Sequence, residues 1–190
     1  MTRSLQDPEG KYAALIEPVA EAHGCRLVHV RMGGSQAGAG NALEIFVERR
    51  DGQPLDMQVC ADISREAGAV LDVEDTVAGA YRLEVGSPGL DRPLSSLEDF
   101  LRFKGFEAKL EFKRPLETDD ARGQKRMRGT IVDATPHGFK FHDDQNRIFD
   151  LSLDDLFAAK LVASEALIKL AQKGQFPKQV QFNENQALEA

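Results

Sequence analysis

Two prolines within six residues constrain this chain more than any other feature. They belong to the stretch Ser87-Pro88-Gly89-Leu90-Asp91-Arg92-Pro93-Leu94. A residue that precedes proline is pushed out of the helical region, so Ser87 and Arg92 are expected to be extended. Pro88 and Gly89 fit the central positions of a type II turn, in which glycine takes a positive φ. The stretch therefore predicts a rigid elbow between domains, because a flexible tether would be richer in glycine and serine.

The composition is that of a globular protein with room for two small domains. The chain has 190 residues, of which 42% are hydrophobic and 29% charged, enough for one large or two small cores. It shows neither the order of a secretory signal nor an apolar run of membrane-spanning length, so we expect a cytoplasmic protein. Cys25 and Cys60 have no partner at ligand spacing and are interpreted as small core residues.

The sequence before the elbow predicts the order αββαβ. Helices are expected over 8–23 and 57–71, and strands over 28–32, 43–47 and 80–86. Pro18 lies inside the first helix and predicts a kink or an early end near Glu17. Asp56 is placed to cap the second helix. In the first strand, Val28, Val30 and Met32 are expected on one face.

A glycine-rich segment over 33–40 separates the first two predicted strands. Gly33 and Gly38 have the spacing of a phosphate-binding loop, but Ala39 stands where that loop has lysine. A strand is expected next, so no helix N-terminus is available to hold phosphate. A long mobile hairpin loop is the favoured interpretation.

The sequence after the elbow predicts a short helix and about five short strands. Ser95 or Ser96 is placed to cap the helix, and residues 106–113 alternate between apolar and charged. Further strands are expected over 129–134, 138–142 and 147–151, followed by a helical turn over 154–157 and an apolar segment ending at 161–162. Such a series is typical of a small SH3-like barrel. Residues from 164 begin as a helix, and the last dozen are expected to be disordered.

The predicted fold class is α+β. A KH-like αββαβ domain over 1–90 is followed by a rigid linker over 91–97, an SH3-like or Sm-like β-barrel over 98–165, and a helical, then disordered tail over 166–190.

Charge is unevenly divided between the two halves. Residues 1–93 carry nine basic and fifteen acidic side chains, whereas residues 94–190 carry fifteen and sixteen. The second half contains one acid-free basic stretch with Arg122, Lys125, Arg126 and Arg128. It is either a solvated hairpin loop or a loop that contacts phosphate through arginine forks. Any contact with nucleic acid is therefore expected to be local.

No convergent set of catalytic groups is found in the sequence. The four histidines lack the spacing of a metal pair, and His142-Asp143-Asp144 is either a weak cation site or, as we favour, turn chemistry. Asp91 and Arg92 either stiffen the elbow through a local bond or contact a partner directly. We expect no catalytic activity, cofactor, metal or small-molecule substrate.

Residues 83–85 together with the elbow resemble the signature of the bacterial ribosome maturation factor RimP family. The segment reads Leu83-Glu84-Val85, then Ser87-Pro88-Gly89-Leu90-Asp91-Arg92-Pro93-Leu94. The layout resembles the family over roughly residues 8–165. Gly86 departs from the serine that the family usually has at this position, and the Gln/Asn-rich tail lies outside the shared region.

The resemblance implies a monomeric, non-enzymatic factor for assembly of the small (30S) ribosomal subunit. The barrel would contact a ribosomal protein of that subunit, and the factor would lie near maturing 16S rRNA. The elbow residues Ser87, Pro88, Gly89, Asp91, Arg92 and Pro93 would join the two domains. The alternative is an Sm-like regulatory RNA-binding protein that acts away from ribosomes.

Overall fold

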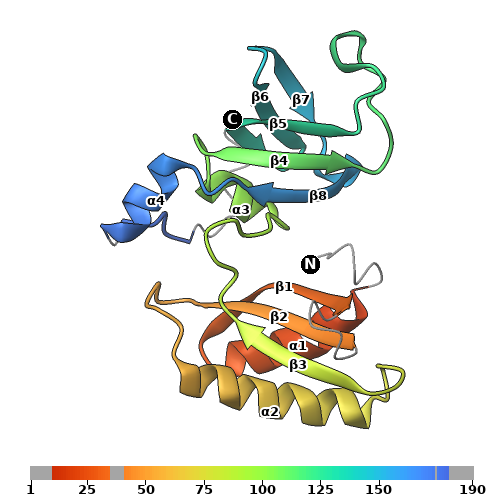
Figure 1. Ribbon diagram of the computed structural model, residues 1–190, viewed down its shortest axis with the longest axis vertical. Helices are drawn as coiled ribbons and strands as arrows, with labels where there is room; N and C mark the ends of the chain where they lie inside the picture. Colours follow the sequence, from red (N-terminus) through yellow and green to blue (C-terminus); the bar gives the residue numbers. More distant parts are fainter. Residues whose placement is uncertain (1–9, 35–40, 174, 180–190) are drawn as a thin grey trace. The chain divides into compact units, whose positions relative to one another are not determined.

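The chain divides between Pro88 and Gly89 into two units, residues 1–88 and 89–190, which are described in turn (Figure 1). The computed structural model describes residues 10–34, 41–173 and 175–179. The first two positions of the helix expected over 8–23, most of the glycine-rich segment and the last eleven positions of the expected disordered tail lie outside these residues.

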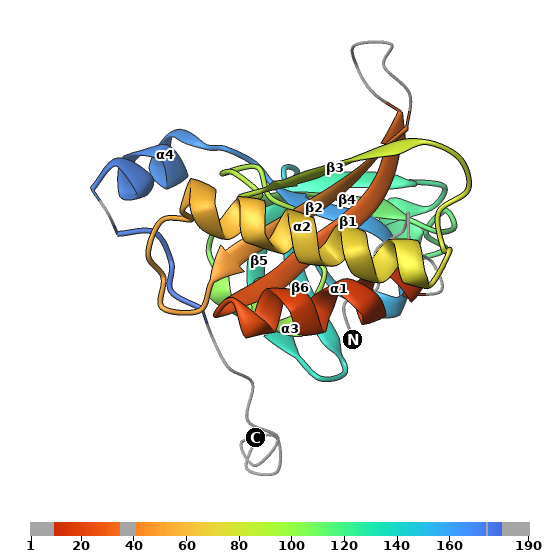
Figure 2. The ribbon, with the colours of Figure 1, turned by 90° about the horizontal axis from the view of Figure 1, so that it is seen from below.

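The first unit has the predicted order αββαβ. Its elements are α1 (Lys11–Ala22), β1 (Cys25–Gly34), β2 (Asn41–Arg49), α2 (Met57–Val73) and β3 (Tyr81–Gly86). The sheet order is β1-β2-β3, with β1 antiparallel and β3 parallel to the central strand β2. A parallel pair needs a crossover connection, which α2 provides. The two helices contact each other and cover one face of the sheet (Figure 2).

Local signals set the ends of the helices. The Asp56 side chain accepts a hydrogen bond of 2.6 Å from the Gln58 amide, so the predicted cap of α2 is confirmed. Gly24 has a φ of 67°, where glycine is favoured, and it follows the last turn of α1. The helix continues through Pro18 to Ala22, so the early end expected near Glu17 is wrong.

β1 contains a bulge, which interrupts the strict alternation that the sequence predicts for this strand. Leu27 pairs with Val47 and His29 pairs with Phe46, which leaves Val28 as the extra residue. An extra residue reverses the inward and outward alternation. Leu27 therefore faces the core on one side of the bulge and Val30 on the other. Val28 itself is 1% exposed, and Val30 and Met32 of the expected set pack in this core.

His29 lies on the outward face of β1 in a partly buried position. Its ring stacks on Phe46 with the two ring centroids 6.4 Å apart. Burial and, to a smaller extent, the Arg31 guanidinium lower the pKa of His29 to about 4, and the Glu44 carboxylate only partly opposes them. The imidazole is therefore neutral at physiological pH.

The second unit contains a five-stranded antiparallel sheet. Its elements are α3 (Leu97–Arg102), β4 (Glu107–Phe112), the 3-10 turn η1 (Asp119–Ala121), β5 (Arg126–Thr135), β6 (Gly138–Asp143), β7 (Ile148–Leu151), the 3-10 turn η2 (Leu153–Asp155), β8 (Leu156–Leu161) and α4 (Glu165–Gln172). The sheet order is β7-β6-β5-β4-β8. Ser96 and Asp99 form a capping box at the start of α3.

The sheet is open over the part of the chain that the structure describes, so the closed barrel is not confirmed. No ladder joins the end strands β7 and β8. The free side of β8 is instead occupied by the end of the elbow. The Leu94 amide donates to the Ala159 carbonyl and the Leu161 amide donates to the Arg92 carbonyl, both at 2.9 Å, and Pro93 forms a bridge to Lys160. Residues 92–94 are thus part of the sheet of the second unit.

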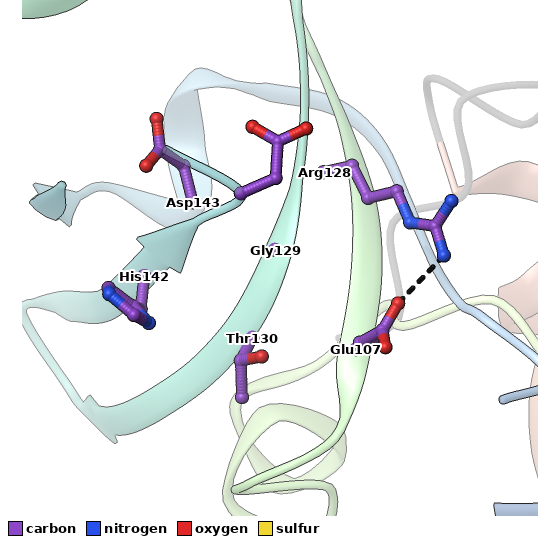
Figure 3. Close-up of a pocket in the computed structure, with 7 residues that line it drawn as sticks. Glu107, Arg128, Gly129, Thr130, His142 and Asp143 are labelled. Carbon is purple, nitrogen blue, oxygen red and sulfur yellow. Dashed lines mark hydrogen bonds and ion pairs between the residues drawn. The ribbon is translucent and has the colours of Figure 1, made fainter. Parts of the chain in front are cut away.

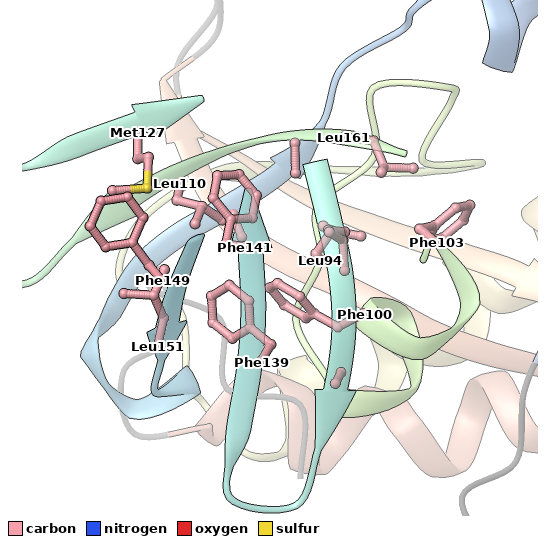
Figure 4. Packing of buried hydrophobic residues seen from close by; sticks show 14 of the residues in the cluster. Leu94, Phe100, Phe103, Leu110, Met127, Phe139, Phe141, Phe149, Leu151 and Leu161 are labelled. Carbon is pink, nitrogen blue, oxygen red and sulfur yellow. The ribbon is translucent and has the colours of Figure 1, made fainter. Parts of the chain in front are cut away.

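Aromatic side chains dominate the core of the second unit (Figure 4). Phe100 of α3 packs on Phe139 of β6 with ring centroids 4.5 Å apart. Leu94 adds the elbow to the same cluster. After α4, Phe176 packs against Phe103 at 5.6 Å and the Pro177 carbonyl accepts a hydrogen bond of 2.7 Å from Arg102 Nε. These contacts fix residues 176 and 177 against α3.

Arg92 is a buried cation within this core. Its side chain is 2% exposed, and its guanidinium carbon lies 5.5 Å from the centre of the Phe103 ring. The negative face of an aromatic ring attracts a cation, and the attraction is stronger when water is excluded. Arg92 therefore anchors the start of the second unit at two points. Its side chain packs on Phe103 at the end of α3, and its backbone carbonyl pairs with β8.

Protonation of His29 is expected to destabilise the first unit in mild acid. The folded pKa of about 4 lies below the unfolded value of about 6.5. Neutral His29 therefore makes its full contribution to the free energy of unfolding above about pH 6.5, and this contribution is lost as the pH falls towards 4. Between pH 7.5 and 5 the free energy of unfolding of the first unit should fall by about 2 kcal/mol.

The measurement is urea unfolding followed by tyrosine fluorescence, since both tyrosines, Tyr12 and Tyr81, lie in the first unit. A His29→Gln variant should lose less stability over this range, and equal losses would contradict the assignment.

Replacement of Arg92 is expected to destabilise the second unit. Arg92→Ala leaves a cavity over Phe103 and should lower the free energy of unfolding of this unit by about 2 to 4 kcal/mol. The exposed neighbour provides the control, because Asp91→Asn should change it by less than about 0.5 kcal/mol. Urea unfolding followed by far-UV circular dichroism gives both values, and tyrosine fluorescence separates the first-unit transition. Equal effects of the two substitutions would rule out the anchoring role of Arg92.

Candidate functional site

The candidate site lies on the outward face of the sheet in the second unit. Along β4 the apolar residues Ala108, Leu110 and Phe112 are buried, so Glu107, Lys109 and Glu111 project outward, as the alternation predicts. On β5 the outward positions are Arg126, Arg128 and Thr130. The site is therefore built from charged side chains that stand on regular strands.

The four predicted phosphate contacts do not form one basic loop. Arg122 follows η1 and pairs with Asp119 at 3.1 Å, and Lys125 is an exposed residue just before β5. Arg126 and Arg128 are on β5 itself, where they pair with Glu111 at 3.3 Å and Glu107 at 2.8 Å. The stretch is acid-free only along the chain, because β4 brings acidic partners to it across the sheet.

A hollow of about 310 Å³ opens beside Arg128 (Figure 3). Arg128 and Glu107 lie on one side of it, and His142 and Asp143 lie on the other. Its lining is completed by Gly129, Thr130 and Asp144. Polar and charged groups of both signs thus surround the hollow.

Gly129 allows β5 and β6 to approach each other closely at this hollow. A Cβ atom at position 129 would lie 2.1 Å from the His142 carbonyl oxygen and 2.7 Å from the Asp143 Cα. Both obstacles are backbone atoms, which cannot move aside without separating the strands. Glycine is therefore required here by space rather than by φ.

Asp143 organises the turn between β6 and β7. Its carboxylate accepts hydrogen bonds from the backbone amides of Gln145 and Arg147 and from the Arg147 guanidinium, at 2.6 to 3.0 Å. Burial acts to raise the pKa of Asp143, but these bonds outweigh burial and hold the pKa below its ordinary value. Asp143 is thus committed to the turn, as the favoured interpretation of His142-Asp143-Asp144 states.

Among residues 10–34, 41–173 and 175–179, no group of three or more His, Cys, Asp or Glu side chains is placed to hold a metal ion. Both cysteines are free thiols in the first unit. Within the same ranges, no helix combines the length and the apolarity needed to cross a bilayer.

The elbow residues divide between the two units. Ser87 and Pro88 belong to the first unit, whereas Gly89 begins the second and has the positive φ, 72°, that the turn predicts. Asp91 lies 3.7 Å from Lys160 and remains exposed. Arg92 is buried and Pro93 bridges to β8. None of these residues lines the hollow.

Two lysines beside the site did not stand out in the sequence. Lys109 pairs in register with Arg128 on one side and with Lys160 on the other. The alternation of residues 106–113 is enough to predict that Lys109 faces outward. No sequence pattern predicts the position of Lys160, because the sequence does not show that β8 lies next to β4.

The first unit matches a known family. Residues 15–91 match the model of the RimP N-terminal domain. The match begins inside α1, includes β1, β2, α2 and β3, and ends in the elbow at Asp91. It thus covers the RimP-like signature as far as Asp91, and it supports the resemblance of this chain to the RimP family.

Proposed function

We propose that this protein is a maturation factor for the small (30S) ribosomal subunit and that it acts by binding rather than by catalysis. The observation that carries the proposal is the match of residues 15–91 to the RimP N-terminal domain. The signature continues beyond the match through Arg92, Pro93 and Leu94. Because these three residues pair with β8, the signature includes the structural start of the second unit.

The second unit is proposed to be the SH3-like or Sm-like module that meets the subunit. Its five antiparallel strands and the 3-10 turn before β8 support this assignment. We assign to this unit a contact with a ribosomal protein and, through the surface around Arg122, Lys125, Arg126 and Arg128, a contact with nearby 16S rRNA. Arginine forks on a sheet surface suit phosphate oxygens.

The first unit is proposed to complement basic ribosomal proteins. Residues 1–93 carry six more acidic than basic side chains, and potentials of opposite sign favour encounter and orientation. The elbow is proposed to fix the angle between the units so that both meet one subunit. The protein would then act in the cytoplasm as a monomer, without a cofactor or a small-molecule substrate.

The proposal predicts that the chain restores subunit assembly in bacteria that lack their own RimP. Such cells should accumulate immature small subunits, and expression of this chain should return the 30S peak and the processing of 16S rRNA to normal. The measurement is sucrose-gradient sedimentation with analysis of the rRNA ends. If Arg92→Ala lowers the amount of protein with a folded second unit, expression of this variant should not return the sedimentation profile to normal.

Co-sedimentation of the purified protein separates the two functions that the sequence leaves open. The protein should sediment with 30S subunits or their precursors and not with 50S subunits. Binding to free RNA without any binding to small subunits or precursors would instead support an RNA-binding protein that acts away from ribosomes.

A further inference from the structure

Three cations lie side by side across the outward face of the second sheet. Lys109 of β4 is in register with Arg128 of β5 and with Lys160 of β8, and all three side chains are exposed. Neighbouring strands are about 4.8 Å apart, so the three positions form a straight line about 10 Å long. We call Lys160, Lys109 and Arg128 the cation row.

The cation row differs from the other cations of this face. Arg126 pairs with Glu111 across β4, and Lys140 pairs with Asp150 across β7, so each cation has one acid in a cross-strand position. Within the row the cross-strand neighbours are cations. Lys109 has no ion pair with any described residue, and Asp91 reaches Lys160 only at 3.7 Å from outside the sheet.

The arrangement has an energetic cost within the protein itself. Like charges directly opposite each other on adjacent strands destabilise a sheet, whereas opposite charges contribute roughly 0.2 to 1 kcal/mol. Two such unfavourable pairs share Lys109. A ligand with a line of negative charge would offset this repulsion, because each cation would then lie next to an opposite charge.

The row also has hydrogen-bond donors to offer. Arg128 gives one bond to Glu107, from Nη2 at 2.8 Å, and a guanidinium has five N–H donors in a planar fork. Lys109 contributes an ammonium group with three donors. Glu107 holds Arg128 through an exposed ion pair, which is worth only about 0 to 1 kcal/mol and can be exchanged for a phosphate.

The hollow described above lies at the Arg128 end of the row. Thr130 and His142 line it with a hydroxyl and an imidazole beside the acidic residues Glu107, Asp143 and Asp144, and Gly129 contributes no side chain. Ribose hydroxyl groups both donate and accept hydrogen bonds. A row of cations that leads to a polar hollow therefore suits a chain that alternates phosphates with sugars better than a line of carboxylates.

We propose that the cation row is the main phosphate-binding element of this protein and that its ligand is the backbone of a single RNA strand crossing β8, β4 and β5 in that order or the reverse. The proposal rests on the proposed function and moves its main RNA contact from the basic stretch to a different set of three residues. Only Arg128 is common to the two sets.

Two triple variants with the same charge change test the proposal. The row variant is Lys109→Gln, Arg128→Gln and Lys160→Gln, and the matched control is Arg122→Gln, Lys125→Gln and Arg126→Gln. Binding of a fluorescently labelled 20-nucleotide single-stranded RNA is measured by anisotropy over a range of salt concentrations. Each lost phosphate contact lowers the slope of log K against log salt by about 0.7, so the row variant should lose about 2 units of slope. The control should lose less than the row variant.

A single substitution tests the proposal through an expected gain of RNA affinity rather than a loss. Glu107→Gln removes the ion pair that competes for Arg128, so it should tighten RNA binding and leave the salt slope equal or steeper. Thermal unfolding of every variant shows whether it is folded. Lys109→Gln should melt at the same temperature as the native chain or slightly higher, because it removes repulsion from the row.

The outcomes distinguish this proposal from the proposed function. If the control loses as much slope as the row variant or more, the row is not the main phosphate site, although binding to small subunits can persist. If the row variant keeps its RNA slope but no longer binds small subunits, the row contacts a protein and the RNA proposal is wrong. If the native chain binds RNA through the row but never sediments with small subunits, the proposed function fails and the row assignment stands.

Discussion

The pairing of residues 92–94 with β8 is the interaction on which the second unit depends. It gives the outer side of β8 hydrogen-bond partners, and it delivers Leu94 to the core and the Arg92 guanidinium to the face of Phe103. It occupies the side of β8 that does not face β4. The register of Lys160 with Lys109 is set on the other side, by the ladder between β8 and β4. A short piece of signature sequence thus contributes to both the core and the sheet of the second unit.

The charges of the second unit fall into two energetic classes. Asp143 is buried, and its carboxylate is bound by two amides and the Arg147 guanidinium; removing any partner would leave a buried charge uncompensated, which is costly. The pairs of Arg126 and Arg128 with β4 are exposed, and pairs of this kind contribute about 0 to 1 kcal/mol. Only the second class can exchange its partners for an external ligand without loss of fold. This difference explains why the outward face of β4 and β5 is a binding candidate and the β6–β7 turn is not.

The sequence predicts features that depend on neighbouring residues and misses those that depend on distant ones. The αββαβ order, the Asp56 cap, the alternation of β4 and the positive φ of Gly89 each follow from a few adjacent residues. The bulge at Val28 is not visible in the sequence, because the two adjacent apolar residues Leu27 and Val28 allow either phase of the alternation. The sequence shows the basic stretch, but its acidic partners and Lys160 come from strands whose order is set by tertiary packing. These neighbours could therefore not be predicted from local pattern.

The division of the signature between two units has a consequence for folding during synthesis. Its first residues complete the parallel strand β3 and can pack as soon as the first unit has emerged. Its last residues have their partner in β8, which is made much later, and contacts between distant segments are slow to form. Domains generally fold from the N-terminus while the chain is still growing. The segment from Arg92 to Leu94 therefore stays unpaired until all five strands of the second unit have been translated, and α4 and the contacts of residues 176 and 177 are added after it has docked.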